Sequence, residues 1–425
     1  MWFNFSRKTR STNDNRQRRT SFRPKLETFE DRWMPSTLTV TSIADKGAGS
    51  LRADIAAAQN GDTINFAPSL DGQTITLKSE LLINKNLTIT GPGAGQLTVS
   101  GNNISRVFEM ASGSQVSLTG LTISNGYAVN GAGILVDTGA VLAVSNATLS
   151  GNSATKPQKY VGNWGGGIDN YGTATVSNCT LTNNTSLGGG GGIYNHATLT
   201  VNNNSAVSGN SDVGIANTGM ATISGSTLSD NGGGGIYNFN SGTITVRDSL
   251  LNGNFAYGDG GGIHNGGTAT ISNCTFSGNT APEYGGAIYS SSNFAGSGRL
   301  NVSGCTLSGN SSTHGSGGAI YISGGTATIS GCTLSDNTAA FTGGGIYVYH
   351  GTVTVSGSTL SGNSAYDGGG LYVSIGGTVT VENSSSITGN SAPVGFGADV
   401  DNLGVLYLDA SSIIGILDGK PAVRI

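Results

Sequence analysis

A four-residue signature, Gly-Gly-x-Ile, recurs along most of this 425-residue chain. The copies end at Ile168, Ile193, Ile236, Ile263, Ile288, Ile320, Ile346 and, with Leu in the last place, Leu371. Degenerate copies end at Ile134 and Ile215, so the repeat is about 26 residues long. Internal repeats of this length are typical of solenoids, propellers and arrays of small units. A chain built in this way cannot be divided into ordinary globular domains by its length alone.

A second element, an apolar residue followed three places later by Asn, lies between successive signatures. Its copies are Leu149/Asn152, Leu181/Asn184, Val207/Asn210, Leu228/Asn231, Leu251/Asn254, Phe276/Asn279, Leu307/Asn310, Leu334/Asn337, Leu360/Asn363 and Ile387/Asn390. Gly supplies 71 residues, but the absence of a G-X-Y period and the presence of only 8 Pro exclude collagen. The Thr, Ser, Val and Ile between these elements are typical of short strands joined by tight turns.

One repeat, residues 260–279, indicates how a coil is built. Alternation along each strand points Ile263 inward and His264 outward, and later points Ile271 and Phe276 inward. Three short strands per repeat, each stacked on its copy in the next repeat, form a right-handed parallel β-helix. We therefore predict an all-β fold, a single-stranded right-handed parallel β-helix (solenoid) with a short N-terminal capping helix. A propeller is less suitable because its repeats are about 40 residues or longer.

Two inward columns carry polar or thiol side chains. The first contains Asn170, Asn195, Asn217, Asn238 and Asn265, whose amides would have to bond to one another along the axis because burial of an unpaired amide is costly. The second contains Cys179, Cys274, Cys305 and Cys332. Parallel Cβ vectors in such a column fit disulfide geometry poorly, and the spacing suits no metal site. We predict an Asn ladder and buried free thiols.

We expect four segments along the chain. They are a basic disordered or targeting tail over residues 1–36, an N-terminal cap over 37–75, the β-helix over 76–402 and a C-terminal cap over 403–425. The cap should contain a helix over Ser50–Ala58, with Ser50 as its N-cap and with Leu51 and Ile55 on one apolar face. A helix is expected here because the end of a solenoid exposes unpaired strands and apolar core.

The formal net charge of −4 hides an asymmetry. Residues 1–32 hold nine Lys or Arg and four acidic residues, which leaves −9 on the rest of the chain. A basic terminal stretch is typical of a targeting or processing segment, although it lacks the apolar run of a standard secretory signal. The acidic body argues against nucleic-acid binding. No run approaches 18 apolar residues, so we predict no transmembrane segment.

The outward column beside the Asn column is rich in tyrosine. It contains Tyr194, Tyr237, Tyr289, Tyr321, Tyr347 and Tyr372, an aromatic stripe that could stack on sugars. The best local group of ionisable residues is Asp169 with Lys156 and Lys159, which we interpret as solvated charges, with a catalytic cluster as the alternative. Because the outward column has no adjacent charged pair, we predict no catalytic, cofactor-binding or metal site. We also expect no cleft with three or more ionisable side chains on the repeat region.

Both repeated elements resemble those of a known family. Phe276-Ser-Gly-Asn279 followed by Gly285-Gly-Ala-Ile288 matches the FxxN and GGA[ILV] elements of the polymorphic outer membrane protein repeat, and the similarity covers about residues 130–400. The segment Arg23–Ser36 resembles the LExLEDRxxP motif of planctomycete surface and secreted proteins. The resemblance implies a β-helix, an adhesive role and a secreted or cell-surface location.

We therefore expect a secreted or cell-surface, structural or adhesin-like protein without catalytic activity. We expect a monomer without cofactors, whose partners are surface glycans or other surface proteins. The alternative is a polysaccharide-binding or polysaccharide-cleaving protein of the pectin lyase-like type, because many parallel β-helices are lyases or hydrolases. A lyase needs a base such as Lys or Arg near carboxylates, and a hydrolase needs paired carboxylates.

Overall fold

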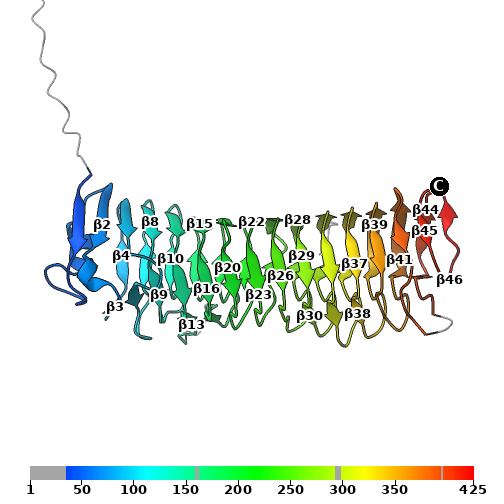
Figure 1. Cartoon of the computed structure of the whole chain (residues 1–425), viewed down its shortest axis with the longest axis horizontal. Coiled ribbons are helices and arrows are strands. Elements are labelled where there is room, and N and C mark those ends of the chain that lie inside the picture. Colours follow the sequence, from blue (N-terminus) through cyan, green and yellow to red (C-terminus); the bar gives the residue numbers. More distant parts are fainter. Residues whose placement is uncertain (1–34, 158–161, 292–297, 394–395) are drawn as a thin grey trace, which may run out of the picture. The chain divides into compact units, whose positions relative to one another are not determined.

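The computed structural model describes residues 35–157, 162–291, 298–393 and 396–425. Residues 35–425 form one compact unit, a rod of stacked coils that Figure 1 shows from blue at its first strand to red at its last. Apart from its last two residues, the tail that we assign to residues 1–36 lies outside the described residues. The all-β right-handed parallel β-helix predicted from the repeats is confirmed.

The first of three rows of parallel strands is the signature row, in which the strands of the repeats begin at the last residue of the Gly-Gly-x-Ile motif. It contains β4 (Leu81–Ile83), β7 (Phe108–Met110), β10 (Ile134–Val136), β14 (Ile168–Asn170), β18 (Ile193–Asn195), β21 (Ile215–Asn217), β24 (Ile236–Asn238), β27 (Ile263–Asn265), β31 (Ile288–Ser290), β35 (Ile320–Ile322), β43 (Val400–Asn402) and β46 (Leu417–Gly419). The longer strands β39 (Ile346–Ser356) and β41 (Leu371–Glu382) run through this row and into the next.

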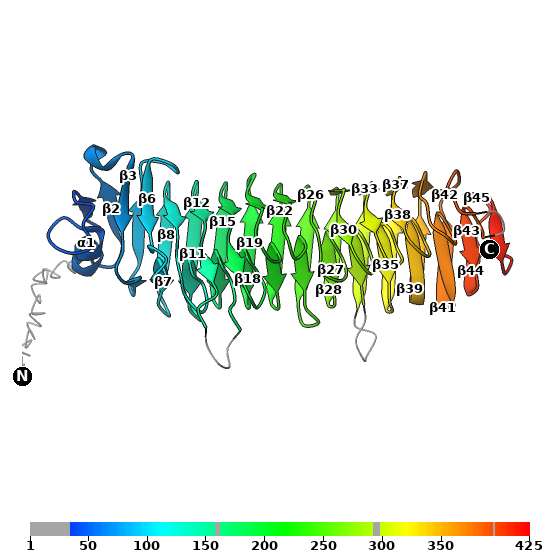
Figure 2. The same ribbon diagram turned by 90° about the horizontal axis from the view of Figure 1, so that it is seen from below.

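The second row is the threonine row, named for its outward side chains. Besides β39 and β41 it contains β1 (Thr37–Val40), β2 (Asp62–Phe66), β5 (Leu87–Thr90), β8 (Gln115–Thr119), β11 (Val141–Ser145), β15 (Thr173–Ser177), β19 (Thr198–Asn202), β22 (Met220–Ser224), β25 (Thr243–Arg247), β28 (Thr268–Ser272), β32 (Arg299–Ser303), β36 (Thr326–Ser330), β44 (Val405–Leu408) and β47 (Val423–Arg424). Figure 2 shows these strands stacked in one straight row.

The third row closes each coil. It contains β3 (Gln73–Thr76), β6 (Leu97–Ser100), β9 (Thr122–Ser124), β12 (Thr148–Ser150), β16 (Thr180–Thr182), β20 (Ala206–Ser208), β23 (Thr227–Ser229), β26 (Leu250–Asn252), β29 (Thr275–Ser277), β33 (Thr306–Ser308), β37 (Thr333–Ser335), β40 (Thr359–Ser361), β42 (Ser386–Ile387) and β45 (Ile413–Ile414). We call the turn from this row to the next signature strand the corner. Short strands pair there, namely β13 (Ser153–Ala154), β17 (Thr185–Ser186), β30 (Thr280–Ala281), β34 (Ser311–Ser312) and β38 (Thr338–Ala339).

The core is one continuous column of apolar side chains from Val40 to Leu408. Ile263, Ile271 and Phe276 are fully buried, as their alternation predicts. Each inward position stacks on its equivalent, since Ile263 pairs in register with Ile236 on one side and with the next signature residue on the other. Apolar area is therefore buried both within a coil and between coils.

Two asparagine ladders run along the core. In the signature row, each Nδ2 from Asn170 to Asn238 donates to the Oδ1 of the next Asn at 2.7–2.8 Å, which confirms the predicted ladder. A second ladder starts at Asn152 and joins the Asn of every repeat to Asn390 by Nδ2–Oδ1 bonds of 2.9–3.1 Å. The bonds satisfy buried amides that would otherwise be costly.

The two glycines of the signature are required for different structural reasons. Gly260 has φ +69°, a left-handed conformation that favours glycine, and a Cβ there would clash with the carbonyl oxygen of Ile263. At Gly261 the conformation is ordinary, but a Cβ would clash with the carbonyl oxygen of Gly286 in the next coil. The first glycine therefore turns the chain at the corner, and the second allows the coils to approach closely.

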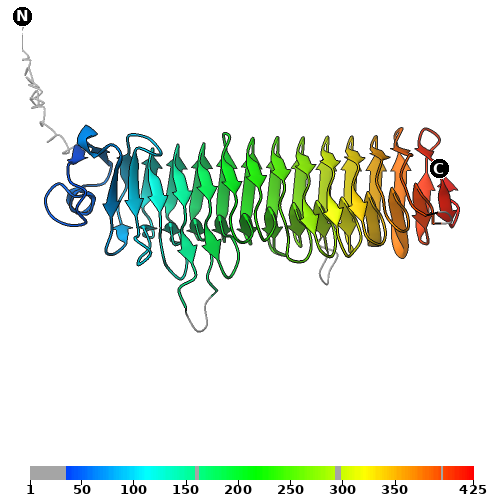
Figure 3. The same cartoon turned by 60° about the horizontal axis from the view of Figure 1, so that its bottom comes forward.

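The N-terminal end is covered by helix α1 (Leu51–Ala57), as expected. The Ser50 hydroxyl accepts a hydrogen bond from the Ala53 amide at 3.2 Å, and Leu51 and Ile55 are buried. Figure 3 shows this helix at the blue end. Strands β1 and β2, inside the segment that we assign to the cap, already pair in parallel. A short 3₁₀ turn covers Pro68–Leu70. The boundaries between caps and β-helix remain predictions. In the described residues, no helix is long and apolar enough to span a membrane.

The predicted cysteine column is present. All four thiols are buried and free. The Cys274 amide donates to the sulfur of Cys305 at 3.3 Å, and the Cys305 amide donates to that of Cys332 at 3.4 Å. The thiols thus take the place that serine hydroxyls such as that of Ser358 occupy in other coils.

Candidate functional site

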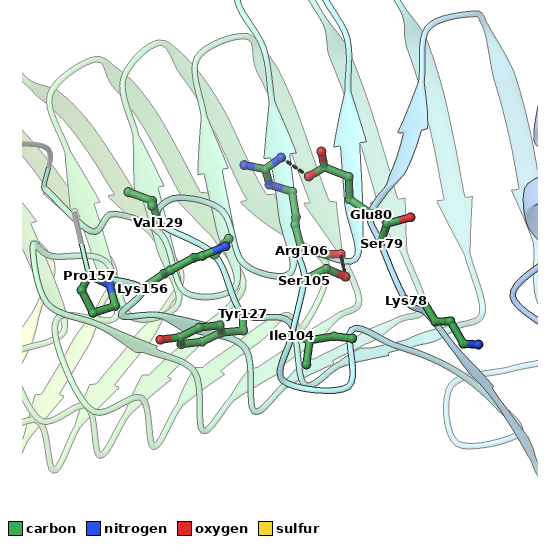
Figure 4. A pocket seen from close by; sticks show the side chains of 11 residues that line it. Lys78, Ser79, Glu80, Ile104, Ser105, Arg106, Tyr127, Val129, Lys156 and Pro157 are labelled. Carbon is green, nitrogen blue, oxygen red and sulfur yellow. Dashed lines mark hydrogen bonds and ion pairs between the residues drawn. The ribbon is translucent and has the colours of Figure 1, made fainter.

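A groove crosses the corners of four consecutive coils near the N-terminal end (Figure 4). Its volume is about 600 Å³, and it is lined by residues 78–80, 104–106, 127–129 and 156–157. Each of these segments leads toward a signature-row strand, namely β4, β7, β10 and β14. Because the coils stack in register, their corners lie side by side and place side chains from distant parts of the sequence on one surface.

The groove contains three cationic side chains, of which one is in ion pairs and two are not. The guanidinium of Arg106 is half-buried and pairs with Glu80 at 2.5 Å and with Glu109. Burial raises the pKa of Glu109, while the charge of Arg106 opposes that rise. Lys78 and Lys156 are exposed, and neither has an ion-pair partner among the described residues. The groove therefore offers two ammonium groups on either side of a guanidinium that is already neutralised.

The remaining lining fits an extended anionic ligand. Ile104 lies between the two lysines and Tyr127 lies beside Lys156 (Figure 4), where the tyrosine supplies a ring and a hydroxyl. Serines 79 and 105 add hydroxyl groups that can donate or accept hydrogen bonds. In the described residues, no group of three or more His, Cys, Asp or Glu is placed to hold a metal ion. The arrangement can hold negative charge by direct contact with ammonium groups.

The three residues of the predicted ionisable cluster have different positions. Lys156 lines the groove, and Lys159 lies outside the described residues. Asp169 is not among the lining residues, and its carboxylate is fully buried. The Nε2 atom of His196 is 3.1 Å from Asp169 Oδ1, a contact without the geometry of a hydrogen bond. The structure therefore does not bring Asp169 and Lys156 together in one pocket.

Aromatic rings enclose the Asp169 carboxylate. The His196 imidazole stacks on Tyr171 with 4.0 Å between ring centroids and on Tyr194 with 4.4 Å, and it meets Trp164 edge-on at 5.3 Å. Burial raises the pKa of Asp169, and the nearby His196 opposes that rise. Burial also raises the pKa of the Tyr171 hydroxyl, with a further contribution from the Asp169 charge. The carboxylate is closed off from solvent, so this cluster packs the coils together and leaves no opening for a ligand.

The tyrosine column lies in one register, as predicted, but its rings face one another. Tyr237, His264, Tyr289, Tyr321, Tyr347 and Tyr372 form a continuous stack with centroid distances of 4.1–5.5 Å. Two members of the predicted stripe, Tyr194 and Tyr321, are buried. The ring faces are occupied by neighbouring rings, which leaves ring edges toward solvent. A sugar-binding role for this stripe remains a prediction, and the stacking does not favour it.

Reasoning from the sequence missed the groove. We expected no cleft with three or more ionisable side chains on the repeat region, yet Lys78, Glu80 and Arg106 meet Lys156 in this one. Lys78, Glu80 and Arg106 belong to the coils before that region and only Lys156 lies within it, so the expectation does not apply to this groove and stays a prediction. The available signal was the clustering of basic residues before residue 160 in a chain whose later part is acidic.

Comparisons with known proteins agree with the fold. The family described as right-handed β-helix region matches residues 106–265 and 213–386. No curated protein matches the sequence. The similar solved structures include the Agl-KA catalytic domain, with 15% identity, a TM-score of 0.45 and coverage of 87% of this chain. The present chain covers 64% of that domain, less than two thirds of its length.

Two further structures have similar folds. The surface adhesin PfbA of Streptococcus pneumoniae has 12% identity and a TM-score of 0.44, with coverage of 89% of this chain and 94% of that chain. A mannuronic acid specific polysaccharide family 6 lyase from human gut microbiota has 10% identity and a TM-score of 0.42, with coverage of 82% and 87%. Likeness at these identities concerns the fold alone.

Proposed function

This chain belongs to the right-handed β-helix region family, and on that premise we propose that it is a secreted or cell-surface, adhesin-like rod that binds acidic glycans in its N-terminal groove without cleaving them. The observation that carries the proposal is the pair of exposed lysines, Lys78 and Lys156, which flank a single groove of about 600 Å³. An extended chain of carboxylated sugars could contact both lysines at once.

The distribution of charge along the rod favours this site for an anion. Residues 35–157 contain six basic and seven acidic side chains, whereas residues 162–425 contain four and thirteen. The later coils would therefore repel an acidic polymer, and the early coils would not. Field lines from the groove lysines would steer the polymer to this end of the rod, and added salt would weaken the attraction.

Binding without cleavage is the simpler interpretation of the side chains in the groove. A lyase needs a basic group poised at the sugar and further groups that stabilise the developing charge. Arg106 is held by two carboxylates, and Lys78 and Lys156 come from opposite ends of the lining. Cleavage of an acidic polysaccharide in this groove is the alternative function.

The test is calorimetric titration with size-defined oligouronates, with neutral oligosaccharides of equal length for comparison. The double variant Lys78→Glu/Lys156→Glu should bind the acidic ligand at least about tenfold more weakly, because each reversal removes an attraction of about 1 kcal/mol or more. Arg247→Glu/Lys420→Glu has the same change of net charge away from the groove and should bind as the wild type does. Equal losses in both variants, or no binding by the wild type, would contradict the proposal. Release of unsaturated sugars would indicate cleavage instead.

A further inference from the structure

The outward face of the threonine row is a regular lattice over nine coils. Each strand from β15 to β41 points three side chains outward, two residues apart, and the first two of these positions form the columns that are rich in threonine. The third position is occupied by Ser177, Asn202, Ser224, Arg247, Ser272, Ser303, Ser330, Ser356 and Glu382. The first column consists of Thr173, Thr198, Met220, Thr243, Thr268, Arg299, Thr326, Thr352 and Thr378. The second consists of Thr175, Thr200, Thr222, Thr245, Thr270, Asn301, Thr328, Thr354 and Thr380. We call the eighteen positions of these two columns the threonine face, and fifteen of them are threonine.

The spacing of the threonine face follows from the fold. Parallel coils are separated by about 4.8 Å, and outward residues two apart in a strand are separated by about 6.6 Å. The register holds without a shift from β15 to β36. Because nine coils give eight steps, the lattice is about 38 Å long. The strands form one row (Figure 2), and their in-register pairing makes the threonine side chains repeat along the axis.

The threonine hydroxyls are free to meet solvent. All fifteen threonines are partly or well exposed. Within the described residues, none of their hydroxyls has a hydrogen-bond partner in the protein, in contrast to Thr218, whose hydroxyl donates to the carbonyl of Asn195. Arg299 is the single charged side chain of the eighteen positions. The two columns thus present an array of hydroxyl and methyl groups with one charge, and the third outward column beside them adds Arg247 and Glu382.

Strand propensity alone does not account for this uniformity. Val, Ile, Tyr and Phe are enriched in strands as Thr is. The coils before β15 use the same positions differently, with Gln115 and Ser117 in one coil and Val141 and Ala143 in the next. The third row carries Thr in one outward column, but mostly Ser, which lacks the methyl group, in the other.

We propose that the threonine face binds ice. The two repeats of the lattice are close to the oxygen spacings on faces of hexagonal ice, so hydroxyl groups can take lattice positions while methyl groups order the water between them. The low charge of the two columns also suits a neutral crystal, since charged side chains hold their own hydration shells. This activity is separate from glycan binding, because the groove lies at the corners of the coils that precede the lattice.

The test measures ice-affinity partitioning, thermal hysteresis and inhibition of ice recrystallisation for the full chain. The face variant Thr326→Lys/Thr352→Lys changes two exposed threonines on adjacent coils. The matched control Thr333→Lys/Thr359→Lys places the same charges on the third row of the same coils, at equally exposed positions. We expect the wild type and the control to enter ice, and the face variant to lose partitioning to the level of an unrelated protein.

Two controls separate a loss of ice binding from unfolding and from a loss of glycan binding. Circular dichroism should give equal melting temperatures for the two lysine variants, because all four positions are on the surface. The groove variant Lys78→Glu/Lys156→Glu should retain full ice affinity even where it loses glycan binding, which separates the two proposals. Exclusion of the wild type from growing ice, or equal loss in the face variant and its control, would overturn the ice-binding proposal.

Discussion

The coils of residues 35–157 and those of residues 162–390 share one fold but differ in what they repeat. The later coils repeat the same side chains at the same places, which creates ladders of asparagine, a stack of aromatic rings and a lattice of threonine. The earlier coils vary from one to the next, and their corners hold the cationic groove. Repetition in this rod gives continuous surfaces and a satisfied core, whereas a localised site arises where the repetition is imperfect.

The same contrast appears in how buried polar groups are satisfied. In the repeats, Asn279 accepts from both the amide and the Nδ2 of Asn254 and donates to the Leu251 carbonyl and to Asn310. In the early coils, Arg106 instead depends on two carboxylates at the surface. Ladder bonds lie in a dry core, where a missing partner is expensive, while the surface ion pairs are screened by water.

The largest effect is expected for a charge placed in the core of a repeat. Ile263→Asp would bury a carboxylate among stacked apolar side chains, without a partner, and should lower the free energy of unfolding by about 4 kcal/mol or more. Thr270→Asp in the same coil is a control at an outward position, for which we expect a change below about 0.5 kcal/mol. Urea denaturation measures both. Similar midpoints for the two variants would contradict the inward assignment of the signature residue.

A smaller loss is expected when the asparagine ladder is interrupted. Asn279→Ala removes the acceptor of two hydrogen bonds and the donor of two more, which leaves the Asn254 amide and the Leu251 carbonyl unpaired. We expect a loss of about 3 kcal/mol. Asn252→Ala, at a half-buried position of the same repeat, should cost less than about 1 kcal/mol. A loss no larger than that of Asn252→Ala would show that the ladder contributes little.

A third effect concerns acid stability. Burial in the ring stack lowers the pKa of His264 from 6.5 to about 4. The unfolded chain therefore binds a proton between pH 6.5 and pH 4 that the folded chain does not, and the repeats lose about 3 kcal/mol over that interval. His264→Tyr, which restores the residue of neighbouring coils, should abolish this loss. Urea denaturation at pH 4 and pH 7 measures the loss of unfolding free energy in each protein. An equal loss in the wild type and in His264→Tyr would contradict the burial of His264 in the ring stack.

The neighbouring carboxylate acts in the opposite direction. Burial, with a contribution from Glu283, raises the pKa of Asp259 to about 6, so this group favours the folded state at low pH and loses that contribution as the pH rises from 4 to 6. The contribution of Asp259 is the same in the wild type and in His264→Tyr, so it cancels when the two proteins are compared. Asp259→Asn removes this contribution. The free energy of unfolding of this variant should therefore fall more between pH 7 and pH 4 than that of the wild type.

The repeated parts of the molecule could be predicted from the sequence, and the groove could not. Positions such as Ile263 and Asn265 recur at a fixed place in each repeat, so their orientation and partners follow from periodicity. Lys78 and Arg106 are on corners whose conformation no repeat specifies, and only the path of the chain places them beside Lys156. The partner of Asp169 was missed for a related reason, because His196 lies just past the end of the next signature strand and belongs to no column.

The central claim is that an acidic glycan binds at the irregular coils and not along the repeats. Hydrogen exchange with saturating oligouronate tests this directly, because it maps protection along the whole chain. We predict slower exchange of the amides in residues 104–106 and 127–129, which line the groove, and no change in β31, β35 and β39, which carry Tyr289, Tyr321 and Tyr347 of the ring stack. Protection over those three strands, with an unchanged groove, would contradict the account.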